Sequence, residues 1–162
     1  MMQKNSHGFT IFLIVVATMI FFSCKHNEVY YQFDEIKNGE WAKTDTLYFY
    51  IDSSLVDNGT PYDVTLEITH NAAYTYSNIW FYTQDNLNDT EFASDSKQYE
   101  LSDLFGRWQG SGFGALYQLS LPYKKSVYFN EKRNFCIKIV HGMRDEPLAG
   151  IEKVGIKIEH SR

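Results

Sequence analysis

Residues 141–150 (HGMRDEPLAG) concentrate groups that could do chemistry near the C-terminal end of the chain. A histidine, an arginine and two acids lie within six positions, as in a loop that transfers protons. The alternative is a solvent-exposed connection whose charges pair locally. Pro147 suits the first turn of a short helical piece, and Gly150 allows the chain to reverse. We therefore expect a structural connection between two strands, in which the side chains of Leu148 and Ile151 are buried against the fold.

Two further stretches have the residue types of known sites without their spacing. Residues 85–91 (DNLNDTE) are acidic, but an EF-type calcium loop needs an oxygen ligand and a glycine where Leu87 and Thr90 stand. Residues 110–114 (GSGFG) lack the lysine of a phosphate-binding loop, and Gln109 replaces the first glycine of a nucleophile elbow. The sequence predicts a solvated loop at the first stretch and a tight turn or bulge at the second.

The histidines and cysteines do not predict a metal site. His70 and His141 show neither the HxH nor the HxxxH spacing of zinc ligands. Cys136 lies in an apolar run (FCIKIV), where a buried and inert thiol is expected. No cofactor, small-molecule substrate or catalytic set is predicted, so we expect that the protein is not an enzyme.

Residues 1–23 have the pattern of a lipoprotein signal peptide. Lys4 precedes an uncharged apolar run at 9–22, which is shorter than the roughly 20 residues that span a bilayer. Cys24, preceded by serine and followed by KHNE, resembles the cysteine of a bacterial lipobox. We expect acyl chains such as palmitate on Cys24 and attachment to a membrane through them. The alternative is an uncleaved signal anchor in which Cys24 is incidental.

Residues 24–162 have the size of one domain and an acidic charge. Removal of the leader with Lys4 changes the formal net charge from −5 to −6. Such a domain lacks the positive surface that binds nucleic acid or an anionic leaflet. We therefore expect no nucleic-acid partner, and membrane attachment through the lipid alone.

Alternating apolar and polar residues predict antiparallel strands in most of this domain. Residues 24–45 are polar with scattered aromatic side chains, and we interpret them as the lipidated N-terminus and a tether, with Trp41 anchored on the domain at 46–162. About eight strands and no long amphipathic helix predict a single antiparallel β-sandwich, immunoglobulin-like or jelly-roll-like, with a closed barrel as the alternative. The alternating runs are 47–52, 64–69, 79–82, 98–101, 117–121, 126–129, 135–139 and 154–159.

Aromatic residues suggest a binding surface. The alternation places Tyr48, Tyr50, Trp80 and Tyr82 on the side of their strands opposite the apolar residues. Such a strip could stack on sugar rings or dock a protein partner, unless loops and the N-terminal segment cover it. Arg144 is a further candidate for a docking surface.

Several segments together resemble the GldH family of gliding motility lipoproteins. They are Trp41 at the end of the polar stretch, residues 78–81 (NIWF), residues 106–114 (GRWQGSGFG) and the HGMR, LAGI and VGI patterns of 141–156, so the resemblance covers residues 28–159. It implies a lipoprotein of the cell envelope, on the outer membrane, in Bacteroidetes-type bacteria, with no catalytic or ligand-binding residues to carry over.

The same resemblance implies an association with the gliding machinery and the linked type IX secretion system. The function we expect is a non-catalytic interaction module that docks other gliding or secretion proteins of the envelope. The alternative is a carbohydrate-binding surface lipoprotein that uses the exposed aromatic side chains.

Overall fold

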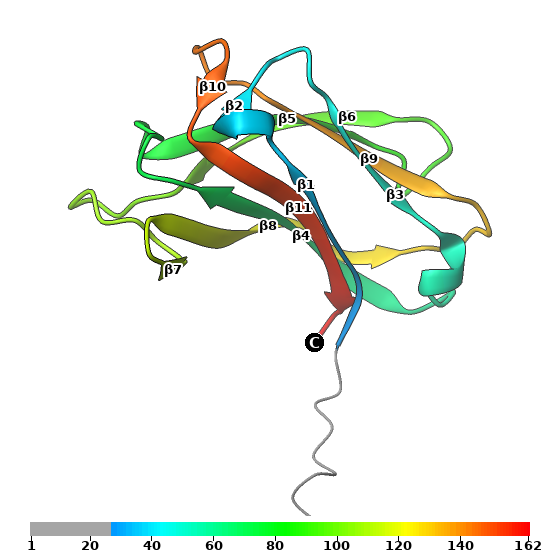
Figure 1. Ribbon diagram of the computed structural model, residues 1–162. Helices are drawn as coiled ribbons and strands as arrows, with labels where there is room; N and C mark the ends of the chain where they lie inside the picture. The colour runs from blue at the N-terminus through cyan, green and yellow to red at the C-terminus, as the bar shows by residue number, and fades with distance from the viewer. Residues whose placement is uncertain (1–26) are drawn as a thin grey trace, which may run out of the picture.

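The computed structural model describes residues 27–162, which form an almost entirely β structure (Figure 1). The signal peptide and Cys24 lie outside the described residues. No helix in the described part is long and apolar enough to cross a membrane. The elements are β1 (Glu28–Glu35), the 3-10 turn η1 (Lys37–Gly39), β2 (Glu40–Trp41), β3 (Leu47–Ile51), the 3-10 turn η2 (Ser53–Leu55), β4 (Pro61–His70), β5 (Asn78–Asp85), β6 (Ala93–Glu100), β7 (Ser111–Phe113), β8 (Leu116–Tyr128), β9 (Phe135–His141), β10 (Leu148–Ala149) and β11 (Ile151–His160).

Two antiparallel sheets face each other and form the sandwich that the sequence predicted. One has five strands in the order β1-β11-β4-β8-β7, and the other has four in the order β3-β9-β5-β6. A small ribbon of β10 and β2 lies at one end, at the top of Figure 1. Because no strand of one large sheet pairs with a strand of the other, the fold is a sandwich and not the closed barrel considered as the alternative.

The strands of five or more residues number eight in the described chain, but one of them differs from expectation. The runs at 117–121 and 126–129 are parts of one strand, β8. The remaining strand is β1, which lies in the stretch interpreted as a tether and pairs with β11 from Glu28 to Glu35. Its sequence, EVYYQFDE, shows no clean alternation because β1 is an edge strand, and much of it stays exposed.

The core fills the space between the two sheets with the apolar side chains that alternation assigned to it. Trp41, the expected anchor, is fully buried, and its Nε1 donates to the Asp45 carbonyl at 2.7 Å. Burial of each large aliphatic or aromatic side chain stabilises the fold by roughly 1.5–3 kcal/mol. The central contributors are Val64, Leu66, Ile68, Ile79, Phe81, Ile137, Ile139, Val154, Ile156 and Ile158.

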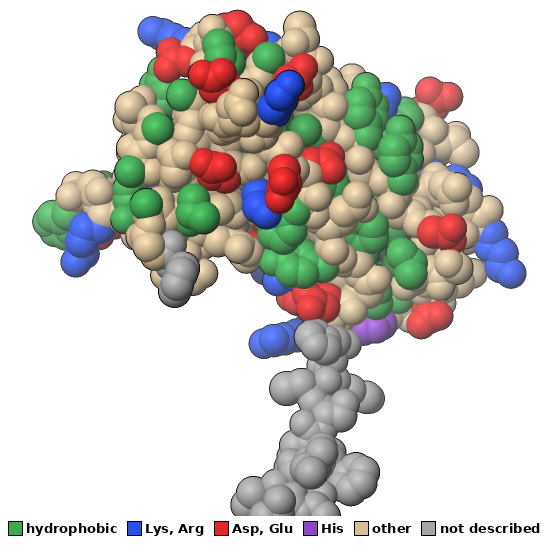
Figure 2. Space-filling view, in the orientation of Figure 1, with side chains coloured by type: hydrophobic (Ala, Val, Ile, Leu, Met, Phe, Trp, Pro, Cys, Tyr) green, Lys and Arg blue, Asp and Glu red, His purple; other side chains and the backbone are tan. Residues whose placement is uncertain are grey.

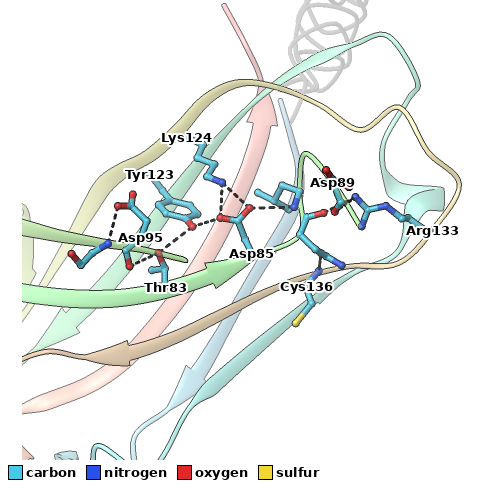
Figure 3. A network of polar contacts seen from close by, with 11 residues as sticks. Thr83, Asp85, Asp89, Asp95, Tyr123, Lys124, Arg133 and Cys136 are labelled. Carbon is cyan, nitrogen blue, oxygen red and sulfur yellow. Dashed lines mark hydrogen bonds and ion pairs between the residues drawn. The ribbon is translucent and has the colours of Figure 1, made fainter. Parts of the chain in front are cut away.

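A buried ion pair joins the two sheets where β5 ends (Figure 3). Asp85 points inward, and its carboxylate accepts hydrogen bonds from Lys124 Nζ at 2.7 Å, from the Tyr123 hydroxyl and from the Leu87 amide. Burial and the neighbouring Asp85 raise the pKa of Tyr123, which keeps the phenol protonated as a donor. A buried charge without such partners costs several kcal/mol, so this pair fixes how β5 lies against β8.

A second group of contacts holds the loop that follows. Arg133 Nη2 donates to the carbonyls of Asn86 and Asp89 at 2.6 and 2.7 Å (Figure 3). Asn86 also accepts from the Cys136 amide at 2.7 Å. The acidic stretch is therefore partly structural. Asp85 belongs to the inter-sheet ion pair, Leu87 is buried in the core, and only residues 88–92 are exposed.

Gly150 is a position where the fold requires glycine. Its φ is +88°, and a Cβ there would overlap the backbone of Tyr74. Gly59 has a similar φ of +77° with open space around it. We expect Gly150→Ala to lower the free energy of unfolding by roughly 3 kcal/mol or more, and Gly59→Ala by about 1 kcal/mol, because only the first adds overlap to backbone strain. Urea unfolding followed by tryptophan fluorescence measures both, and equal losses would contradict the close packing at Gly150.

Candidate functional site

The corner between β9 and β11 is structural, although its local conformation differs from the prediction. Leu148 and Ile151 are both buried, as expected. The predicted helical turn is wrong, because Leu148 is part of β10 and pairs with Trp41 of β2. A two-residue strand is stabilised by its partner, and that partner lies more than 100 positions away along the chain.

The ionisable groups of this corner do not converge on a reaction centre. His141 is buried against the Trp41 ring at 5.2 Å, and burial lowers the pKa of its imidazole. Glu146 instead accepts from the Lys43 amide at 3.0 Å, on the surface. Lys43 Nζ donates to the Arg144 carbonyl at 3.2 Å, and Arg144 itself is exposed. The histidine and the acids therefore occupy different environments.

The four predicted aromatic residues lie on the outer face of the four-stranded sheet. Strand β5 alternates, with Ile79, Phe81, Thr83 and Asp85 inside and the residues between them outside. The four side chains remain open to solvent on this face. The exposed fractions are 45% for Tyr48, 66% for Tyr50, 39% for Trp80 and 55% for Tyr82.

The tyrosines of β3 and the aromatic residues of β5 form two groups separated by β9. Tyr48 and Tyr50 are stacked, with ring centroids 6.3 Å apart and an interplanar angle of 10°. Lys138 of β9 pairs in register with Tyr48 on one side and with Gln84 on the other. Green side chains along β3, on the right of Figure 2, show the edge of this face.

One residue of this face, Phe92, could not be found by alternation. Phe92 precedes β6 and is 40% exposed, and the ammonium of Lys138 lies 3.8 Å from its ring centroid. We define the aromatic face as Tyr48, Tyr50, Trp80, Tyr82 and Phe92, with Lys138 among them. The polar alternation of β9 predicted that Lys138 points outward, but no sequence signal placed it against Phe92.

Gly142 lies against Trp80 and Tyr82 of the aromatic face. Its amide donates to the Trp80 carbonyl at 2.7 Å, just beyond the end of β9. A Cβ on Gly142 would lie 2.9 Å from Cε2 of Tyr82 and 3.2 Å from Cβ of Trp80. The missing side chain therefore lets the Tyr82 ring lie close to the sheet. This is a packing reason for the glycine in the HGMR pattern.

A shallow hollow of about 250 Å³ opens beside Tyr82. Its lining also includes Thr46, Gln84, Lys138 and residues 139–140, so a phenol ring, an amide and an ammonium group surround it. These groups can stack and donate hydrogen bonds, but they include no acid–base pair. The hollow is suited to binding, and its residues supply no proton-transfer machinery.

Neither cysteine chemistry nor metal binding adds to this face. Cys136 is a buried free thiol whose pKa is raised by burial, as expected for an inert structural cysteine. Among residues 27–162, no group of three or more histidine, cysteine, aspartate or glutamate side chains is placed to hold a metal ion.

The fold and this face define a β-sandwich domain that exposes a group of aromatic side chains on one sheet. The profile of the GldH lipoprotein family matches residues 28–158, and the chain belongs to that family. A gliding motility lipoprotein GldH homolog of Christiangramia forsetii is 31% identical over 161 residues, covering 95% of this chain and 97% of that protein. The gliding motility lipoprotein GldH of Flavobacterium johnsoniae is 26% identical over 156 residues, covering 91% and 94%.

Solved structures add little to this assignment. The tobacco streak virus coat protein aligns with 86% of this chain and 91% of its own, at 10% identity. The TM-score of 0.29 is too low to support a common architecture.

Buried histidines make the stability of the domain depend on pH. Burial lowers the folded-state pKa of both His70 and His141 below the usual value of about 6.5. The unfolded chain therefore binds more protons below pH 6.5, and the free energy of unfolding decreases as the pH falls through that value toward the folded pKa. We expect a loss of up to about 1.4 kcal/mol per pH unit and histidine between pH 6.5 and 5, measured by urea unfolding.

Carboxylates with a lowered pKa, such as Asp63, lose their contribution to the free energy of unfolding only at more acidic pH. The change in stability between pH 6.5 and 5 therefore comes from the histidines. His141→Gln should flatten the slope, because glutamine does not titrate. An unchanged slope in this variant, with His70 intact, would show that His141 does not contribute to it.

Proposed function

We propose that this protein is an envelope-anchored lipoprotein that acts as a non-catalytic docking module for other envelope proteins. The observation that supports this proposal best is the aromatic face, whose large side chains remain open to solvent on a rigid sheet. Exposed aromatic residues grouped on one face are unfavourable in water and are typical of surfaces that bind a partner. Their position on regular strands also limits the entropy lost on binding.

The composition of the face supports a protein partner. Protein interfaces are enriched in tyrosine, tryptophan and phenylalanine at their centre, are depleted of charges there, and have a polar rim. Lys138 is the charged residue within the aromatic face. The neighbouring strand β6 gives this face a polar edge, formed by Ser94, Ser96 and Gln98. Tyr82 and Trp80 are therefore the side chains we expect to contribute most to binding.

The names of the relatives support a physiological context for the proposed partners. The relatives are gliding motility lipoproteins by name. We propose that the protein is held by lipid on Cys24 in the outer membrane and that it docks components of the gliding machinery and the linked type IX secretion system. The acidic domain would not bind an anionic leaflet unaided, so the lipid is the element that holds it at the membrane.

Replacement of Cys24 tests the anchor. We expect Cys24→Ala to abolish incorporation of labelled palmitate and to move the protein from the membrane fraction to the soluble or uncleaved precursor fraction, because no acyl chain can be attached. Function in motility should be lost together with the anchor. Normal fractionation of the mature Cys24→Ala chain would exclude lipid attachment at this position.

A surface variant tests the aromatic face. The double variant Trp80→Ala, Tyr82→Ala should weaken co-purification of envelope partners from crosslinked membranes by roughly tenfold or more, since buried aromatic anchors carry most of an interface's binding energy. Tyr128→Ala is a matched control, because Tyr128 is 47% exposed on the other sheet. Unchanged thermal unfolding of the double variant would show an intact fold, whereas Phe81→Ala should cost about 3–5 kcal/mol. Equal recovery of partners by the double variant and wild type would exclude this face.

Carbohydrate binding is the second candidate, favoured by the hollow beside Tyr82. An aromatic ring next to an amide and an ammonium group can stack on a sugar and hydrogen-bond its hydroxyls. Affinity electrophoresis in gels that contain envelope polysaccharide separates the two candidates. A retardation that disappears in the Trp80→Ala, Tyr82→Ala variant and persists in Tyr128→Ala would favour the glycan, and the absence of any retardation favours protein docking.

A further inference from the structure

A second apolar feature lies outside the aromatic face, at the tip of the loop that joins β6 to β7. Leu104 is 102% exposed and Phe105 is 82% exposed, more than any other large hydrophobic residues of the described chain. The two side chains are adjacent and contribute nothing to the core. In the left part of Figure 2 this loop stands away from the body of the domain, with green and blue side chains at its end.

The tip is held in one conformation by Asp103. Its Oδ1 accepts from the amides of Phe105 at 2.8 Å and Arg107 at 2.9 Å, and its Oδ2 accepts from Arg107 Nε at 2.7 Å. The Gly106 amide donates to the Asp103 carbonyl at 3.0 Å. The hydrogen bond from the Arg107 amide lowers the pKa of Asp103 below its usual range, so the carboxylate remains charged and the turn closed at neutral pH. Leu104 and Phe105 are therefore presented by an ordered turn.

The base of the loop is joined to the end of the sandwich. The Gln109 amide donates to the Leu101 carbonyl at 2.8 Å, and the Leu101 amide donates to Ser77 at 2.7 Å. The Trp108 ring packs on buried His70, at the end of β4, with centroids 4.4 Å apart. The base of the loop is therefore packed against the buried end of β4.

The tip lies far from the place where the described chain begins. His70 pairs with Ile151 at the start of β11, whereas Asn27 donates to the His160 carbonyl at its end. A ten-residue strand separates these two points by about 30 Å. Because Cys24 is only three positions before Asn27, lipid on Cys24 would hold the end of the domain opposite to this loop.

The charges around the tip do not suit a bilayer. Segments that bind an anionic membrane surface typically combine several Lys or Arg side chains with apolar residues. Here Arg107 is paired with Asp103, and Glu100 leaves the neighbourhood with a net negative charge. Ser102 and Gln109 line an adjoining open hollow, so an apolar anchor is bordered by hydrogen-bonding groups. This is the anatomy of a protein-interface hot spot with a polar rim.

We propose that Leu104 and Phe105 form a preordered apolar knob that inserts into an apolar pocket, rimmed by basic side chains, of an envelope protein. This inference rests on the proposed function and adds a second contact, at the end of the domain remote from the anchor. The basic rim complements Glu100 beside the knob. The ordered turn lets the knob bind with little loss of loop entropy.

Site-specific photo-crosslinking in cells that express the full-length lipoprotein tests this proposal. A benzophenone amino acid replaces Phe105, and the matched control carries it at Leu55, which is 45% exposed on η2. We expect one heterologous adduct from position 105 and none of that mass from position 55, with the crosslinked peptide mapping to an apolar pocket with Lys or Arg at its rim. Leu104→Ser should reduce the adduct roughly tenfold, and Leu104→Met should retain it.

Three results would overturn the proposal: no adduct from position 105, an adduct between two copies of this chain, or a lipid adduct. A lipid adduct would agree with co-sedimentation of the purified protein with phosphatidylethanolamine–phosphatidylglycerol vesicles that depends on Leu104 and Phe105. If position 105 gives no adduct while the Trp80→Ala, Tyr82→Ala variant still loses its partners, the proposed knob is excluded. The proposed docking role of the aromatic face is then retained. If the wild type recovers no partner at all, the proposed function fails as well.

Discussion

The alternation of side chains along β5 is the constraint on which the rest of the structure depends. This strand lies between β9 and β6, so both of its edges are paired and its register cannot slip without moving the core. Ile79 and Phe81 must face inward to fill the sandwich, and Asp85 must face inward to meet Lys124. The residues between them are then forced outward. Trp80 and Tyr82 are therefore exposed because of the core, and the same constraint holds them rigidly on the surface.

The two sheets have different roles in this arrangement. The five-stranded sheet contains β1, the first element after the predicted lipidated cysteine, and it receives β11 from the C-terminal end. The four-stranded sheet carries the aromatic face, and the loop with Leu104 and Phe105 continues from its edge strand β6. The ion pair between Asp85 of β5 and Lys124 of β8 connects the two sheets. The strand nearest the proposed anchor and the proposed docking face therefore lie in different layers of the sandwich.

Much of the fold was predictable because the longer strands alternate, and alternation is a local property. The same local pattern predicted the outward direction of Tyr48, Tyr50, Trp80 and Tyr82. It could not show that the face is uncovered, because that depends on where loops and β1 lie. The buried position of Asp85 was missed for a related reason, since its partners on β8 are almost 40 positions away.

The remaining differences concern elements whose stability comes from distant partners. The strand β1 has polar residues at both ends and shows no alternation, and only its pairing with β11 makes it a strand. The two-residue strand β10 depends in the same way on β2. The exposure of Leu104 and Phe105 was also hidden, because two adjacent apolar residues in a sequence are more often part of a core. Their position becomes evident only when the core is seen to be complete without them.

The pairing of β1 with β11 has a mechanical consequence for a protein that belongs to a gliding motility family. A pull on the chain before Glu28, resisted by a partner at the far end of the domain, runs nearly parallel to these strands. Seven residue pairs join β1 to β11, and in this direction they are strained together in shear instead of being opened one after another. The domain would therefore resist forced unfolding from its tethered end more strongly than a sandwich whose first strand peels away from an edge. Tension between an anchor and a moving partner would be carried by the backbone hydrogen bonds of its first and last strands.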